Sequence, residues 1–96
     1  MTDIDVRCAL AVDGWTCVVA LADADGSRTE HHVTVAPTEL ARLAPTAADP
    51  TALVRTTFEF LLEREPKTSI LGRFALPVVS RYFPEYEREI RRRLSA

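Results

Sequence analysis

Glycine is scarce in this chain of 96 residues, and long apolar runs and a strong charge of either sign are missing. Only Gly14, Gly26 and Gly72 are present, so no glycine-rich loop can cradle nucleotide phosphates. No apolar run approaches the roughly 18–20 residues that a membrane-spanning helix needs. The chain has twelve basic and 14 acidic residues, and its net charge of -2 excludes binding of nucleic acid by bulk positive charge.

Cysteine is also rare, with only two in the chain. Residues 1–5 lack the basic and apolar stretches of an export signal, so we expect a cytoplasmic location in which thiols stay reduced. Cys8 and Cys17 fall diagonally in the hairpin predicted below, with Cα atoms about 7–8 Å apart. That separation is too long for a disulfide, and two buried free thiols are therefore predicted.

The residues that are present have an ordinary globular composition, with 47% hydrophobic and 27% charged side chains. The length fits one domain that spans residues 1–96. Residues 1–50 carry three basic and eight acidic side chains, whereas residues 51–96 carry nine basic and six acidic ones. Such a split marks either a binding face or helices with basic C-terminal ends, and we favour the second explanation.

The first part of the chain predicts a three-stranded antiparallel β-meander, because apolar and polar side chains alternate as in strands with one buried face. Asp13-Gly14 is a strong two-residue hairpin signal and pairs Cys8 with Val19. A five-residue second turn pairs Cys17 with Val33, and both registers turn one apolar set inward. The strands are expected at about 4–12, 15–22 and 28–35.

The other face of this meander has small apolar side chains at its centre and charged ones at its margins. Its centre consists of Ala9, Ala11, Val18 and Ala20. A sheet face in contact with water usually carries more threonine, lysine and glutamate. The pattern indicates either an ordinary alanine-rich surface or a contact surface for a second copy or another protein.

The rest of the chain predicts helices separated by prolines. The main helix, about 50–65, has apolar residues at three- and four-residue spacing that should cover the buried face of the sheet, and Pro66 ends it. Short helices are expected before it at 37–43 and after it near 68–74, 76–83 and 85–94. The predicted fold class is α+β, in which a meander (1–36) precedes a helical half (37–96) with two or three short C-terminal helices.

One long segment resembles a known family. The sequence Phe-Glu-Phe-Leu-Leu-Glu-Arg-Glu-Pro-Lys (58–67), then Ser-Ile-Leu (69–71) and Tyr-Phe-Pro-Glu-Tyr (82–86), is similar to a family of small uncharacterised bacterial proteins. The similarity covers residues 53–90 and the strand at 32–35. It implies a bacterial, cytoplasmic domain and supplies no catalytic residues, since the family has no known activity.

Metal sites and catalysis find little support in the sequence. His31 and His32 point to opposite faces of a strand, and Glu30 with His32 provides two ligands where zinc needs three or four. Asp-Ala-Asp-Gly (23–26) lacks the remaining ligands of a calcium loop. No serine, threonine or cysteine has a recognisable base nearby in sequence. We therefore expect no metal, no cofactor and no enzymatic activity.

The favoured interpretation is a small non-enzymatic bacterial interaction module, which forms a homo-oligomer such as a dimer or docks on a protein partner, with no role for a membrane. Its expected contact residues are the centre of the open sheet face and an aromatic segment. These residues are Ala9, Ala11, Val18, Ala20, Tyr82, Phe83 and Tyr86.

The alternative is a DNA-binding regulator with a helix-turn-helix-like segment at 69–83 and a basic C-terminal helix. Its nucleic-acid contacts would be Arg73, Ser80, Arg81, Arg88, Arg91, Arg92 and Arg93. Two observations count against it. Pro77 and Pro84 leave under two turns for the second helix, and the short glycine-bearing turn of the motif is missing.

Overall fold

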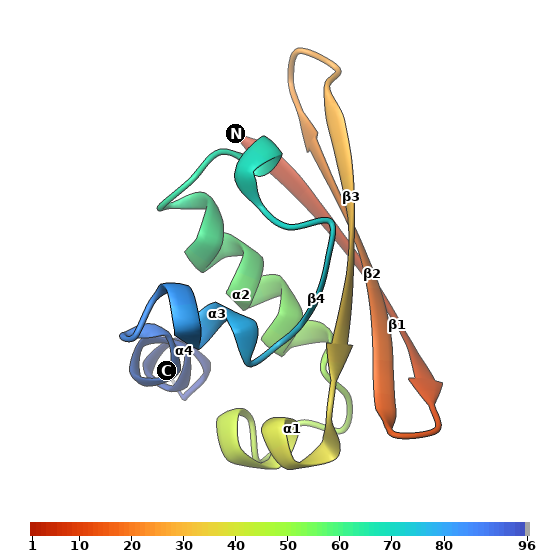
Figure 1. Ribbon diagram of the computed structural model, residues 1–96, viewed down its shortest axis with the longest axis vertical. Coiled ribbons are helices and arrows are strands. Elements are labelled where there is room, and N and C mark those ends of the chain that lie inside the picture. The colour runs from red at the N-terminus through yellow and green to blue at the C-terminus, as the bar shows by residue number, and fades with distance from the viewer. Residues whose placement is uncertain (96) are drawn as a thin grey trace.

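A computed structural model describes residues 1–95 and shows a four-stranded sheet with its helices on one side (Figure 1). The strands are β1 (Thr2–Ala11), β2 (Gly14–Asp23), β3 (Arg28–Val35) and β4 (Arg73–Ala75). The helices are α1 (Pro37–Leu43), α2 (Thr51–Leu62), the 3-10 turn η1 (Lys67–Ser69), α3 (Val78–Tyr82) and α4 (Tyr86–Leu94). No helix in this range is long and apolar enough to cross a membrane.

The α+β class and the meander are confirmed, but the sheet has a fourth strand. The strand order is β1-β2-β3-β4, in which the first three strands are antiparallel and β4 runs parallel to β3. The predicted helix near 68–74 is wrong. His32 N–H donates to the Gly72 carbonyl (2.8 Å) and Leu76 N–H donates to the Thr34 carbonyl (3.0 Å). The open edge of β3 therefore holds this segment in an extended form.

The register of the first hairpin differs from the predicted one by two residues. Ala11 pairs with Gly14, so the turn consists of Val12 and Asp13. Gly14 lies in β2 with φ +135°, where a Cβ would collide with the carbonyl oxygen of Val35. The positive φ and this close approach both require the glycine. Because the shift is an even number of residues, the two strands keep the same inner face, but Leu10 (81% exposed) and Val12 (100% exposed) lie outside the core at the end of the hairpin.

The shifted register places Cys8 directly opposite Cys17, and the two form a disulfide with their Cα atoms 4.0 Å apart. The prediction of two free thiols is wrong because it relied on the diagonal placement of the two residues. The expectation of a cytoplasmic location loses the support of reduced thiols and stays a prediction.

Helix α2 occupies the middle of three layers, between the sheet and the pair α3 and α4 (Figure 1). On the sheet side, Phe58 packs against His31 and Phe74. On the other side, Phe60 meets Phe83 and Tyr86 edge-on, with ring centroids 5.8 and 5.4 Å apart. The main helix is therefore apolar on two sides, whereas the sequence predicted a single stripe toward the sheet.

Candidate interaction surfaces

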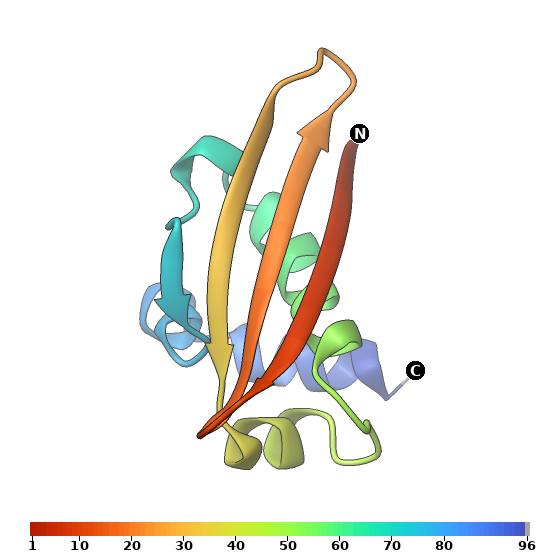
Figure 2. The ribbon, with the colours of Figure 1, turned by 90° about the vertical axis from the view of Figure 1, so that its right-hand side faces the viewer.

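The face of the sheet that points away from α2 is not covered by any helix in the described chain (Figure 2). We define the outer sheet face by Ala9, Ala11, Val18 and Ala20. Ala9 and Ala11 are exposed, and Val18 and Ala20 are half-buried between their neighbours on β1 and β3. The sequence identified this face correctly because the two-residue change of register leaves side-chain alternation unchanged.

Charged side chains border the outer sheet face on both sides. On β1, Arg7 Nε lies 3.2 Å from Asp5 Oδ2, and on β3, His32 Nε2 lies 3.1 Å from Glu30 Oε1. Both pairs join residues of one strand, so each lies along a margin of the face. Exposed pairs of this kind contribute at most about 1 kcal/mol. The strip along β2 between them is uncharged and accessible to another backbone.

Strand β1 forms a free edge of the sheet, since only β2 pairs with it among the described strands. Arg55 on α2 extends its Nη1 to the carbonyl oxygen of Ile4, 2.6 Å away. That carbonyl therefore points away from β2, as alternate backbone groups of an edge strand do. The other outward groups of this ten-residue strand provide a template for a further strand.

The aromatic segment predicted as a contact surface is divided between surface and core. Tyr82 is 66% exposed, whereas Phe83 is half-buried against Phe60. Tyr86 is 1% exposed, its hydroxyl lies 2.7 Å from Thr57 Oγ1, and burial raises its pKa well above the usual value. Tyr86 is therefore a core residue, and its assignment to a contact surface was wrong.

A small apolar pocket of about 190 Å³ opens beside Tyr82. Its wall includes Leu61, Ile70 and Phe74, with Glu65 and Ser69 as polar groups. This pocket could not be predicted from the sequence, because the segment that carries Ile70 and Phe74 was expected to be helical.

Residues 69–83 do not form a helix-turn-helix. They contain the end of η1, the strand β4 and the five-residue helix α3. Arg73 lies on β4 beside His32, Arg81 is exposed on α3, and the hydroxyl oxygen of Ser80 is buried without a hydrogen-bond partner in the described structure. This geometry does not place Ser80 at a DNA groove, and DNA binding stays a prediction that depends on the C-terminal helix.

The arginines of α4 have different partners. Arg93 donates to Glu63 (2.6 Å) and to Glu89 (3.1 Å), and its guanidinium lies near the ring of Phe60. Arg92 also pairs with Glu89, and the hydrogen bonds from Arg92 and Arg93 lower the pKa of Glu89 to about 2. Both arginines are thus engaged within the molecule. Arg88 and Arg91 have no ion-pair partner among residues 1–95.

The histidines and acidic residues do not form a metal site in the described part of the chain, where no three potential ligands gather. His31 is 2% exposed, and its Nδ1 lies 2.7 Å from the Leu71 carbonyl and its Nε2 2.8 Å from Thr29 Oγ1. This arrangement satisfies both ring nitrogens and joins β3 to the segment before β4, so the histidine has a structural role.

No family model, curated protein or solved structure matches the chain. The similarity of residues 53–90 to a bacterial family therefore stays a prediction.

Proposed function

We propose that the protein is a non-enzymatic interaction module that binds a second copy of itself through the outer sheet face. One observation carries the proposal. The chain packs its helices on one face of the sheet and leaves the other open over the part described, although the centre of that open face is small and uncharged (Figure 2).

The size of these side chains suits the packing of two sheets. Facing sheets lie about 10 Å apart when their side chains interdigitate, and small residues allow a closer approach. Val18 and Ala20 lie on β2, inside the charged margins formed by β1 and β3. A two-fold arrangement uses the same surface on both copies, which requires a self-complementary patch. An uncharged centre with both signs of charge at its margins meets that requirement.

The test is the molar mass of the purified protein in solution, measured by light scattering over a range of concentrations. We expect a dimer for the parent chain and a monomer for Val18→Asp and Ala20→Glu, because each places a charged group in the centre of the contact, where association would remove it from water. Ala48→Glu is the matched control, since Ala48 is exposed in the loop before α2 and should leave the dimer intact.

Circular dichroism and urea denaturation establish that the variants fold. A parent chain that stays monomeric at every concentration, or variants that associate as strongly as the parent, would show that the outer sheet face does not bind a second copy.

A further inference from the structure

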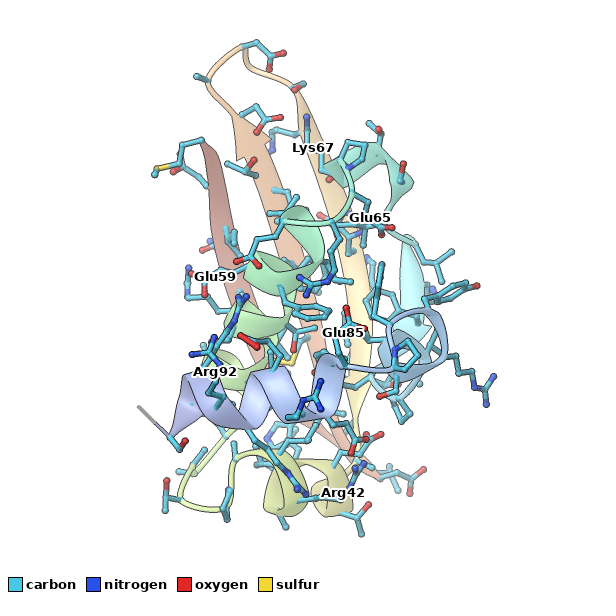
Figure 3. All side chains as sticks on the ribbon, turned by 90° about the vertical axis from the view of Figure 1, so that its left-hand side faces the viewer. Arg42, Glu59, Glu65, Lys67, Glu85 and Arg92 are labelled. Atoms are coloured by element: carbon cyan, nitrogen blue, oxygen red, sulfur yellow. A yellow bond between two sulfur atoms is a disulfide. The ribbon has the colours of Figure 1, made fainter. Side chains whose placement is uncertain are left out.

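A second surface lies on the helical side of the molecule, between α4 and the connection from α1 to α2. Four arginines, Arg42, Arg88, Arg91 and Arg92, surround an open groove of about 1050 Å³, which we call the arginine groove. Figure 3 shows Arg42 on α1 directed toward α4, where it pairs with Glu87. The sequence placed three of these arginines on one helix but could not show that α1 and its following loop face them.

The charge of this groove is one-sided. None of its lining residues is acidic. Arg42 and Arg92 have partners in Glu87 and Glu89, whereas Arg88 and Arg91 have no carboxylate partner within residues 1–95. Arg88 and Arg91 are three residues apart and so share one side of α4. Two neighbouring cations that form no direct ion pair in the described chain favour a ligand that carries negative groups.

The helix dipole does not explain this placement. Basic residues are favoured in the last turn of a helix, which accounts for Arg91 and Arg92. Arg88, however, is the third residue of α4, where the dipole favours acidic side chains such as Glu87 and Glu89. The explanation favoured from the sequence therefore fails for Arg88, and the arginine groove retains a cation at a position that the helix itself disfavours.

The floor of the groove is aliphatic. Leu43 and Ala44 are buried beneath it, and Ala47 and Leu94 are half-buried at its sides. No aromatic ring is among the lining residues, so nucleic-acid bases would find no stacking platform. The groove is also open to solvent, whereas small-molecule sites usually enclose most of their ligand. A ligand of this shape and chemistry needs apolar and anionic groups side by side.

We propose that the arginine groove binds an acidic amphipathic peptide segment of a partner protein. Apolar side chains of the segment lie on Ala47 and Leu94, and its carboxylates accept hydrogen bonds from Arg88 and Arg91, which a guanidinium can donate in pairs. This surface is separate from the outer sheet face, so its occupation does not depend on self-association.

The test is fluorescence anisotropy with a labelled synthetic peptide in which leucine and glutamate alternate. We expect saturable binding to the parent protein that weakens as salt rises. The double variant Arg88→Glu/Arg91→Glu should weaken binding at least about tenfold, since it replaces attraction by repulsion. The same variant should gain affinity for a peptide with lysine in place of glutamate. This gain would show that the variant is folded and that the charge of the groove itself determines which peptide binds.

The matched control is Arg73→Glu/Arg81→Glu, which makes the same change of net charge at exposed positions outside the groove. It should bind the glutamate peptide like the parent. An equal loss of peptide affinity in the two double variants would show that the net charge of the protein, and not the groove, causes the effect. That result would overturn the proposal.

A labelled mixed-sequence DNA duplex, measured at about 50 and 200 mM salt, tests whether the groove binds nucleic acid in place of the peptide. Binding of the duplex in place of the peptide, with loss in Arg88→Glu/Arg91→Glu, would assign the groove to nucleic acid. Absence of peptide binding to the parent chain would equally overturn the proposal.

Discussion

At the scale of single residues, a few buried polar contacts join segments that are far apart in the sequence. Lys67 is 9% exposed, and its Nζ donates to Asp23 Oδ2 (2.5 Å) and Ser27 Oγ (2.7 Å). The hydroxyl of Thr2 donates to the other oxygen of Asp23 (2.6 Å). The start of β1, the turn after β2 and the turn η1 therefore meet at one carboxylate.

Removal of this lysine should lower stability in a pH-dependent way. The hydrogen bond from Lys67, followed by that from Thr2, lowers the pKa of Asp23 below its usual value of 3.8. A carboxylate whose pKa is lower in the folded than in the unfolded protein stabilises the fold at any pH above its unfolded-state pKa. This stabilisation is lost as the pH falls through its folded-state pKa. Lys67→Met should thus lower the urea midpoint at pH 7 and have a smaller effect below pH 3.8.

Arg7→Met is the control for the lysine variant. It breaks the Arg7–Asp5 pair, whose side chains are 84% and 61% exposed, and should change the midpoint little at either pH. An equal loss in both variants, or a loss at Lys67 that is independent of pH, would contradict the account.

The buried hydroxyl pair in the core leads to a second residue-scale prediction. Thr57 Oγ1 donates to the Leu53 carbonyl (2.8 Å), so the Tyr86 hydroxyl donates to Thr57. Tyr86→Phe removes one hydrogen bond and should cost about 1 kcal/mol of unfolding free energy. Thr57→Val leaves the tyrosine hydroxyl buried without its acceptor, at a cost of about 1–3 kcal/mol. Urea denaturation measures both, and a neutral Thr57→Val would argue against the contact.

At the scale of elements, segments with a local pattern or a proline signal were predictable from the sequence, including the short helix at 37–43, whereas the strand β4 was not. The alternation in β1 to β3 and the apolar spacing in α2 indicate their structure locally. Three residues of β4 carry no such signal, because Phe74 becomes part of a strand only beside Val33. The turn was predicted one position too late because Asp13-Gly14 matches a hairpin signal. In the structure Gly14 is already part of β2 and lies against the carbonyl oxygen of Val35.

The same distinction applies to the candidate surfaces. The outer sheet face could be predicted, since side-chain alternation alone defines it. Tyr86 is buried because it packs against Phe60 on the second apolar side of α2. The spacing of apolar residues in α2 does not show that Phe60 faces away from the sheet. The arginine groove could not be predicted because Arg42 and Arg88 approach one another only in the folded chain.

The disulfide of the first hairpin leads to a prediction at this scale. The two cysteines are nine positions apart, and closing a loop of this length stabilises a fold by about 2–3 kcal/mol. A reductant should lower the free energy of unfolding by that amount and leave a Cys8→Ser/Cys17→Ser variant unaffected. Detection of two free thiols in the denatured, unreduced protein would contradict the bond.

The edge of the sheet is the subject of another element-scale prediction. Arg55→Ala removes the hydrogen bond to the Ile4 carbonyl and leaves the edge of β1 open to pairing. We expect concentration-dependent association that persists when Ala20→Glu is added, which separates edge pairing from contact through the outer sheet face. Arg55→Lys retains a donor and should associate like the parent. Unchanged association in Arg55→Ala would show that this arginine does not protect the edge.

At the scale of the whole molecule, the two proposed surfaces lie on different sides of α2, the outer sheet face beyond the sheet and the arginine groove beside α4 (Figure 1). Sites without shared contacts contribute independently. Ala20→Glu should therefore leave peptide affinity unchanged, and Arg88→Glu/Arg91→Glu should leave the molar mass unchanged. Mutual effects in light scattering and anisotropy would show that the surfaces are coupled.

The parallel pairing of β4 with β3 also affects when this chain can fold during synthesis. His32 and Arg73 become neighbours in the sheet only after the residues between them have left the ribosome. Tyr86, which packs beneath Phe60, follows later still. A nascent chain that ends before β4 therefore exposes the edge of β3 and part of the surface of α2. For such a chain, protection of these surfaces by a chaperone matters until β4 and α4 have been synthesised.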